Sequence, residues 1–267
     1  MGTQIHPTAI VDSAAKLGTD VEVGPYSIVG PNVQVGDRCI IKAHVVIEGH
    51  TTLGEECRIW QFASIGSAPQ DLKYNNEPST LIIGKRNIMR EYVTLQPGTK
   101  GGHMTTTIGD NNLFMGSSHV GHDCAVGNNN IFANSCGLAG HVTIMNNVIL
   151  GGMVGIHQFT RIGDNVMLSA GSKVGADVPP FCMAQGDRAH LRGLNLIGLQ
   201  RAGFSEGAIR NLKRAYSHLF GSVGNAIKRI ETMPDEIERD DLVNRMLDFL
   251  ASSTDRGICQ PAKSTSA

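Results

Sequence analysis

Histidines recur in the middle of the chain, at His119, His122, His141 and His157. If segments 18 residues apart lie side by side, these four imidazoles gather in one region. One histidine there would most simply satisfy a chain corner through hydrogen bonds, but four on adjacent segments indicate chemistry. Two kinds fit: a zinc site, which needs three neutral imidazoles about 2.0–2.1 Å from one ion, or a general base with assisting groups.

Two neighbours of the histidines suit the general base. Asp123 directly follows His122, and its carboxylate could fix the imidazole tautomer so that the other ring nitrogen is a free base. Gly140, 18 residues after His122, offers a backbone N–H without a side chain, which could hold an oxyanion. A base, an orienting group and an oxyanion donor together indicate acyl transfer. Because adjacent strand residues point in opposite directions, His122 and Asp123 can meet only at a corner.

The elements that must position these residues follow from a six-residue period. Apolar residues recur at every sixth position, where a helix would show a period of 3.6 and a half-buried strand a period of 2. Such a repeat predicts a hexapeptide solenoid, a parallel β-helix in which three hexads close a triangular coil of about 18 residues. The positions of the first run are Ile5, Val11, Leu17, Val23, Val29, Val35, Ile41, Ile47, Leu53, Ile59 and Ile65.

Interruptions of the period divide the chain. Residues 67–81 and 98–107 leave the pattern and are expected to form surface loops, which in a solenoid often build the binding face. The hexads stop at Asp177-Val178-Pro179-Pro180, so we expect a β-helix over residues 1–186 and a small helical domain over 187–267. Ser205 is the predicted cap of one helix there, and Pro234-Asp235-Glu236 the predicted start of another.

Composition narrows the class of protein. The 267 residues include 32 glycines but only 5% aromatic residues, which suits a thin core of Val, Ile and Leu. A formal net charge of −1 argues against a nucleic-acid partner. The six cysteines contain no C-x-x-C pair, and there is no signal-like segment or apolar run long enough to cross a bilayer. A reduced, cytoplasmic protein without a transmembrane segment is expected.

Six segments, in order along the chain, carry a family resemblance: Gln70-Asp71-Leu72-Lys73-Tyr74, His119-Val120-Gly121-His122-Asp123-Cys124, Leu138-Ala139-Gly140-His141-Val142, Gly151-Gly152-Met153, His157-Gln158-Phe159 and Asp177-Val178-Pro179-Pro180. With this order and spacing, nearly the whole chain resembles the UDP-N-acetylglucosamine O-acyltransferase family, which catalyses the first step of lipid A synthesis. The resemblance, and not the period, implies a left-handed β-helix.

The resemblance also implies a reaction. A 3-hydroxyacyl chain would pass from the phosphopantetheine thioester of acyl carrier protein to the 3-hydroxyl of UDP-N-acetylglucosamine, without a metal or other cofactor. His122 would be the base, Asp123 its orienting group and Gly140 the oxyanion donor. Members of the family are homotrimers with active sites between subunits. The implied substrate-binding residues are Asp71, Lys73, His119, His141, His157, Gln158, Asn195 and Arg201.

Several positions depart from the family pattern. Gln96 and Arg188 stand where members often have His, and Ile197 and Ala202 stand where many carry Glu and a second Arg. Nucleotide contacts and sugar specificity therefore stay open. Ala170, where some members have Gly, implies a somewhat shorter acyl chain. Two alternatives remain: transfer to a 3-amino analogue of the sugar nucleotide, which would give an amide, and a zinc-dependent hydratase of the γ-carbonic-anhydrase type.

Overall fold

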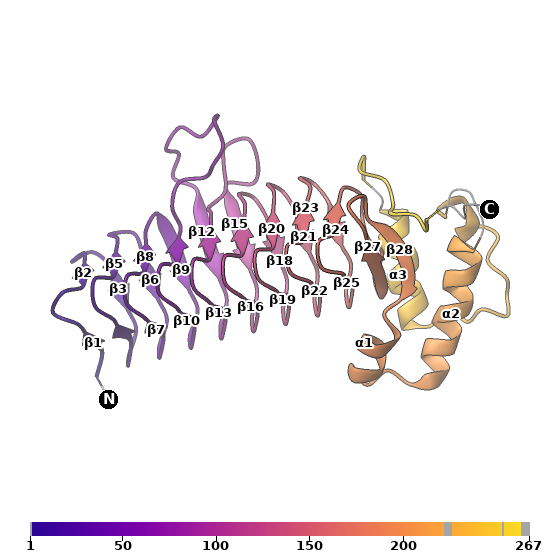
Figure 1. Cartoon of the computed structure of the whole chain (residues 1–267), viewed down its shortest axis with the longest axis horizontal. Helices are drawn as coiled ribbons and strands as arrows, with labels where there is room; N and C mark the ends of the chain where they lie inside the picture. The colour runs from indigo at the N-terminus through magenta and orange to yellow at the C-terminus, as the bar shows by residue number, and fades with distance from the viewer. Residues whose placement is uncertain (1, 222–225, 253, 263–267) are drawn as a thin grey trace.

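The computed structural model describes residues 2–221, 226–252 and 254–262. Most of this chain winds into a solenoid whose short strands form three sheets along its length (Figure 1). Each strand residue of the solenoid pairs in parallel with a residue one coil later, usually 18 positions along the chain, as Ile5 pairs with Val23. The architecture is a left-handed parallel β-helix, and the prediction from the six-residue period is confirmed.

Each full coil gives one strand to each sheet. The first sheet contains β1 (Gln4–Ile5), β4 (Glu22–Val23), β7 (Ile40–Ile41), β10 (Arg58–Ile59), β13 (Ile88–Met89), β16 (Leu113–Phe114), β19 (Ile131–Phe132), β22 (Ile149–Leu150), β25 (Met167–Leu168), β27 (Cys182–Gln185) and β28 (His190–Leu194). The second contains β2 (Ile10–Val11), β5 (Ile28–Val29), β8 (Val46–Ile47), β11 (Ser64–Ile65), β14 (Thr94–Leu95), β17 (His119–Val120), β20 (Gly137–Leu138), β23 (Gly155–Ile156) and β26 (Lys173–Val174). The third contains β3 (Lys16–Leu17), β6 (Gln34–Val35), β9 (His50–Leu53), β12 (Thr80–Ile83), β15 (Thr105–Ile108), β18 (Ala125–Val126), β21 (Thr143–Ile144) and β24 (Arg161–Ile162).

The core is a narrow column of aliphatic side chains. The second residue of nearly every two-residue strand points inward and is buried, which is why the apolar period is six. In the middle coils the core contains larger side chains, and the rings of Phe114 and Phe132 stack there with centroids 4.5 Å apart. Ile5, on the first coil, is 47% exposed because a coil covers it on one side only.

Two loops leave the solenoid between the second and third sheets. The first connects β11 to β12 and the second connects β14 to β15, and Figure 1 shows both projecting from the same edge of the solenoid. Strand pairing continues across both insertions, because Ile59 pairs with Met89 and Met89 with Phe114. The loops therefore add surface at one corner without changing the core.

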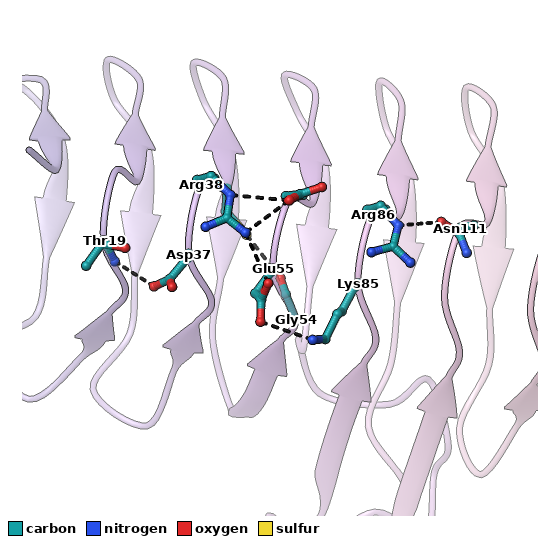
Figure 2. Close-up of polar contacts among 10 residues, drawn as sticks. Thr19, Asp37, Arg38, Gly54, Glu55, Lys85, Arg86 and Asn111 are labelled. Carbon is teal, nitrogen blue, oxygen red and sulfur yellow. Dashed lines mark hydrogen bonds and ion pairs between the residues drawn. The ribbon is translucent and has the colours of Figure 1, made fainter. Parts of the chain in front are cut away.

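The corner between the third and first sheets carries exposed polar pairs instead (Figure 2). Arg38 contacts both Glu55 and Glu56, at 3.1 and 3.0 Å, and Lys85 contacts Glu55 at 3.0 Å. All four side chains are at least 40% exposed, so each pair contributes little stability. This corner is a solvated face, unlike the corner that carries the histidines.

Past the last coils, the chain forms a hairpin and helices at the C-terminal end of the solenoid (Figure 1). Strand β27 pairs in parallel with β25 and antiparallel with β28. The helices are α1 (Leu196–Arg201), α2 (Glu206–Phe220), η1 (Lys228–Ile230) and α3 (Asp241–Ala251). Arg161 of β24 joins the two parts, since its guanidinium contacts the buried Asp177 at 2.8 Å and Ser252 at 3.0 Å.

One helix start was predicted correctly and one was wrong. Ser205 caps α2, and its hydroxyl accepts a hydrogen bond from the Ala208 N–H, as expected. Helix α3 begins at Asp241 and not at Pro234, because Asp240 provides the cap and accepts from the Val243 N–H at 2.9 Å. Among the described residues, no helix combines the length and apolar character of a membrane span.

Candidate active site

Two of the four histidines, His122 and His141, lie at the corner between the second and third sheets, which we call the histidine corner (residues 121–124, 139–142 and 158–160). Three successive coils stack there in the predicted register. The His141 N–H donates to the His122 carbonyl at 2.9 Å, and the Phe159 N–H donates to the Gly140 carbonyl at 3.2 Å. Asp123, His141 and Phe159 each have φ between 57° and 64°, the left-handed conformation that turns the chain at each corner.

This corner conformation lets two adjacent side chains meet. His122 Nδ1 lies 2.8 Å from Asp123 Oδ2, a contact that an extended strand would forbid. The Asp123 side chain is fully buried, whereas His122 keeps 18% of its side-chain surface exposed. In the neutral imidazole, the hydrogen bond from the Nδ1–H to the carboxylate keeps the proton on Nδ1. Nε2 is then the unprotonated nitrogen.

The Asp123 carboxylate is held in its charged form. Burial raises the pKa of Asp123, but hydrogen bonds from His122, from the Thr99 hydroxyl and N–H, and from the His103 N–H outweigh burial and lower that pKa below its ordinary value. A charged Asp123 stabilises a positive charge on the His122 imidazole, which a general base acquires during its reaction.

Gly140 lies directly against the His122 ring. A Cβ atom at this position would approach His122 Cε1 and Nε2 to 2.5 Å, so only glycine leaves room for the imidazole. In the described part of the chain, the Gly140 N–H has no hydrogen-bond acceptor. An unused N–H beside a basic nitrogen is the arrangement that an oxyanion site requires.

His141 occupies the next coil in an aromatic stack. Its ring stacks on Phe159 with centroids 4.4 Å apart and meets the His122 ring edge-on at 5.1 Å. Burial lowers the pKa of His141; the charge of Asp123 opposes that change and His122 adds to it. His141 therefore tends to be neutral near pH 7 and can donate or accept a hydrogen bond.

A cavity of about 590 Å³ opens beside this corner. The first loop supplies Asp71 and Lys73 to its wall, and the corner supplies His122, His141 and Gln158. Asp71 Oδ1 accepts from the Lys73 N–H at 3.0 Å, which fixes the turn that presents both side chains. Residues that the sequence places far apart thus line one cavity within a single chain.

A larger groove of about 780 Å³ runs over the second sheet and contains the other two histidines. His119 and His157 line it, and Gly137 and Gly155 leave its floor without side chains. His119 Nδ1 lies 2.7 Å from the Thr94 hydroxyl. Burial, with a smaller contribution from His122, lowers the pKa of His119. Arg188, one of the departures from the family pattern, also lines this groove.

Three of the predicted site residues lie away from the histidine corner. Asn195 is 6% exposed and caps α1: its amide oxygen accepts from the Gly198 N–H, and its amide nitrogen donates to the Asn165 carbonyl. Arg201 ends α1 at the surface, and Ala170 lies at the corner between β25 and β26. Within one chain, the structure does not bring these residues to His122.

The other residues that depart from the family pattern are Gln96, Ile197 and Ala202, and the structure shows where each one lies. Gln96 is buried and its amide oxygen accepts from the Gln70 N–H at 3.3 Å, so it fastens the first loop. Ile197 is 65% exposed on α1, and Ala202 is the C-cap residue of that helix. Neither contacts the histidine corner.

Several groups around the histidine corner were not predicted. The second loop surrounds Asp123 with the N–H and hydroxyl of Thr99 and the N–H of His103. Arg256 places its guanidinium 5.8 Å from the centre of the Phe159 ring. Backbone donors leave no trace in residue types, and nothing in the sequence places Arg256 beside residue 159. The interruption of the hexads at residues 98–107 was the single available signal for the second loop.

The side chains of His122, Asp123 and His141 can be compared with what the zinc alternative requires. The ligand atoms of His122, Asp123 and His141 lie within 4.8 Å of one another, the distance range of a metal site. However, both Asp123 oxygens already accept hydrogen bonds, one of them from His122 Nδ1. A zinc ion would have to displace these donors, and among the described residues the group contains two imidazoles where the hydratase chemistry needs three. The group fits a base with its orienting carboxylate better than it fits a metal.

Comparisons with known proteins place the chain in a family. Residues 177–259 match the family model "Udp N-acetylglucosamine O-acyltransferase; Domain 2", and residues 14–49 and 32–67 match the bacterial transferase hexapeptide model. An acyl-[acyl-carrier-protein]--UDP-N-acetylglucosamine O-acyltransferase of Rickettsia bellii is 54% identical over 99% of this chain and 94% of its own. The enzyme of the same name from Thermodesulfovibrio yellowstonii is 44% identical over 96% and 99%.

Solved structures give the same family. LpxA from Acinetobacter baumannii is 42% identical, with a TM-score of 0.92 over 96% of this chain and 99% of its own. The UDP-N-acetylglucosamine acyltransferase of Francisella novicida is 35% identical, with a TM-score of 0.92 over 99% and 96%. With such identity over nearly its whole length, the chain belongs to the UDP-N-acetylglucosamine O-acyltransferase family.

Proposed function

We propose that this protein transfers a 3-hydroxyacyl chain from acyl carrier protein to the 3-hydroxyl of UDP-N-acetylglucosamine, the first step of lipid A biosynthesis. The observation that carries the proposal is the His122–Asp123 contact of 2.8 Å beside the free N–H of Gly140. The contact provides an oriented base, and the N–H provides a site for negative charge within reach of that base.

The chemistry begins at the sugar hydroxyl. His122 Nε2 accepts its proton as the oxygen attacks the carbonyl carbon of the carrier's thioester. The carbonyl oxygen becomes an oxyanion, and the Gly140 N–H donates a hydrogen bond to it. When the tetrahedral intermediate collapses, the carbon–sulfur bond breaks, and the departing thiolate takes the proton from the His122 imidazolium. The products are the sugar ester and the free thiol of the phosphopantetheine arm.

Asp123 supports both proton transfers. Its lowered pKa keeps the carboxylate charged at neutral pH, so it holds the productive tautomer before the reaction and stabilises the imidazolium during it. A general base of this kind contributes about 10²–10⁴-fold in rate. The reaction needs no metal or other cofactor in this scheme, since the acyl donor arrives on the carrier's own prosthetic arm.

The two hollows suit two parts of the substrates. Asp71, Lys73 and Gln158 line the cavity next to His122, where the sugar and its diphosphate would lie. The groove beyond His119 and His157 has an apolar floor that suits an acyl chain. Its volume of about 780 Å³ lies within the ordinary range of about 300–1,000 Å³ for ligand sites.

The remaining predicted contacts require a second subunit. Asn195, Arg201 and Ala170 lie away from His122 in one chain, so we place the active sites between the subunits of a homotrimer. The nucleotide would then meet Arg201 of a neighbouring copy. Asn195 would fix the start of α1, where its amide already acts as a cap. The described cysteines are all unpaired, which suits a reaction in the reducing cytoplasm.

The test is direct acyl transfer by the purified protein, followed by mass spectrometry. A set of 3-hydroxyacyl carrier proteins of different chain length is offered with UDP-N-acetylglucosamine and, separately, with its 3-amino analogue. Ester formation by the wild type, and its loss in His122→Ala, would support the proposal. Transfer to the amine alone would make the protein an N-acyltransferase. Transfer to neither acceptor, or full activity of His122→Ala, would overturn the proposed reaction or its base.

A further inference from the structure

The second loop folds over the Asp123 carboxylate and supplies most of its hydrogen bonds. The Thr99 N–H lies 3.1 Å from each carboxylate oxygen, and the Thr99 hydroxyl donates to Oδ2 at 2.7 Å. The His103 N–H donates to Oδ1 at 2.7 Å. Within the described residues, the hydrogen bond that the solenoid itself contributes to this carboxylate comes from the His122 ring. The loop, more than the coil, therefore sets where the Asp123 carboxylate points.

Within this loop, Thr99 makes the side-chain contact with the Asp123 carboxylate. It is only 3% exposed, and in the described structure its hydroxyl is the one loop side chain that donates to Asp123. A charge-assisted hydrogen bond of 2.7 Å belongs to the stronger class. Replacing the hydroxyl by a methyl group would leave Asp123 Oδ2 with fewer donors in a buried place, where unpaired charge is costly.

Backbone contacts hold Thr99 in position. The N–H groups of Gly102 and Met104 donate to the Thr99 carbonyl at 3.1 and 3.2 Å, so the loop closes on itself at this residue. The next residue, Lys100, donates its N–H to Glu77 Oε1 at 2.8 Å, which ties the second loop to the first. These hydrogen bonds hold the backbone of the loop in place at Thr99.

Glycine at position 102 is a second sign of close fit. A Cβ atom there would overlap the Asp123 carboxylate, although the backbone of Gly102 does not have the positive φ that favours glycine. Space for the carboxylate, and not backbone conformation, is what glycine provides here. The loop and the carboxylate are therefore shaped to each other.

From these contacts we propose that Thr99 is a positioning residue for catalysis. Its hydroxyl holds Asp123 in the one orientation from which the carboxylate fixes the His122 tautomer, so Thr99 acts on the reaction through Asp123. Thr99 also lines the cavity beside His122, but its hydroxyl donates to Asp123. This inference rests on the proposed function, in which His122 is the base. It assigns a role to the 98–107 insertion, which the interrupted period predicts only as a surface loop.

The experiment compares Thr99→Val with Thr99→Ser and with a control, Thr106→Val. Valine keeps the size and removes the donor, whereas serine keeps the donor. Thr106 is also fully buried, but its hydroxyl has no partner in the described structure, so its loss should not change activity. We expect kcat to fall about tenfold in Thr99→Val with KM little changed, by analogy with metal sites, where losing the partner that orients a ligand costs about 10–100-fold. Thr99→Ser should keep most of the wild-type kcat.

Two readouts separate positioning from a general loss of structure. The ¹⁵N shifts of His122 should show protonated Nδ1 in the wild type and a mixture of tautomers in Thr99→Val. In a double-mutant cycle, Thr99→Val should cost nothing further once Asp123→Ala has removed the carboxylate. If Thr99→Val does not fold, Gly102→Ala, whose Cβ would overlap the Asp123 carboxylate and displace it, should give the same mixture of tautomers and loss of kcat.

The outcomes distinguish this inference from the proposed function. If His122→Ala and Asp123→Ala lose activity while Thr99→Val keeps the wild-type kcat and tautomer, the role of Thr99 is wrong and the reaction stands. A loss of kcat in Thr99→Val that persists at equal size in the Asp123→Ala background would also overturn it. If His122→Ala keeps full activity, the proposed base itself fails.

Discussion

Substituting Gly140 by alanine tests the geometry of the proposed base with a single methyl group. The backbone at Gly140 has no positive φ, so alanine fits the chain conformation itself. The new Cβ would lie 2.5 Å from both Cε1 and Nε2 of His122, where ordinary contacts begin at 3.4 Å. The imidazole must therefore retreat, and its retreat strains the 2.8 Å contact with Asp123.

The size of the effect follows from that displacement. A shift of about 1 Å in a reacting group costs on the order of 10²-fold in rate. A hundredfold loss corresponds to about 2.7 kcal/mol of transition-state free energy. The Gly140 N–H is still present in the variant, so the loss reports the position of His122 and not the removal of the oxyanion donor. We expect kcat to fall about 100-fold, without loss of stability, since Gly→Ala also restricts the unfolded chain.

The assay is steady-state acyl transfer measured beside thermal unfolding. Gly207→Ala is the matched control, because its Cβ would meet only the Ser205 hydroxyl oxygen, at an ordinary 3.8 Å, on α2. We expect the control to keep wild-type kcat. A Gly140→Ala enzyme that works within twofold of the wild type would refute the packing of the His122 ring against Gly140 and the dependence of the rate on that position.

Three further predictions concern other contacts. In Asp123→Asn, the thermal midpoint should fall at pH 7, because a carboxylate with a lowered folded pKa stabilises the protein above its unfolded pKa; the difference from wild type should narrow as the pH falls below about 4, and a constant difference would contradict this. Gln158→Ala should raise KM for the sugar nucleotide about tenfold and change kcat little, as expected when a contact binds ground and transition states alike; a loss in kcat as deep as that of His122→Ala would show a different role. Arg161→Met should lower the free energy of unfolding by about 3–5 kcal/mol, because it leaves the buried Asp177 without its charged partner, the guanidinium 2.8 Å away; a smaller loss in denaturant unfolding would mean that the remaining donors, the residue 161 N–H and the Thr254 hydroxyl, are enough for the carboxylate.

Sequence spacing was sufficient for the solenoid and for much of the histidine corner. Inward residues must recur once per strand, so the period of six predicted the coils and the stacking of residues 18 apart. The same register placed His141 beside Asp123 and Gly140 beside His122, and the structure has both. It also indicated that His122 and Asp123 could meet only at a corner, which is where they do.

Contacts that depend on tertiary structure could not be predicted from the spacing of residues in the sequence. Pro234-Asp235-Glu236 has the residue types of a helix start, yet α3 begins later. The side chain of Asn211 on α2 donates to the Glu238 carbonyl and to Asp240 Oδ2, which holds the approach to α3 in place. The donors around Asp123 are partly backbone N–H groups of a loop, and any residue type could supply them. For the same reason, the role of Asn195 as a helix cap could be found only from its neighbours.

The coil-by-coil pairing of the solenoid has a consequence for how the protein loses its structure. Each coil contacts mainly the coils before and after it, so cooperativity runs along one dimension and opening proceeds from coil to coil. The coils that carry His122 and His141 lie in the interior of this series, with neighbours on both sides. Amide hydrogen exchange should therefore be slowest near these coils and faster toward the first ones. Partial opening at an end would leave the reacting groups assembled, which is a form of robustness that a globular enzyme with one shared core does not have.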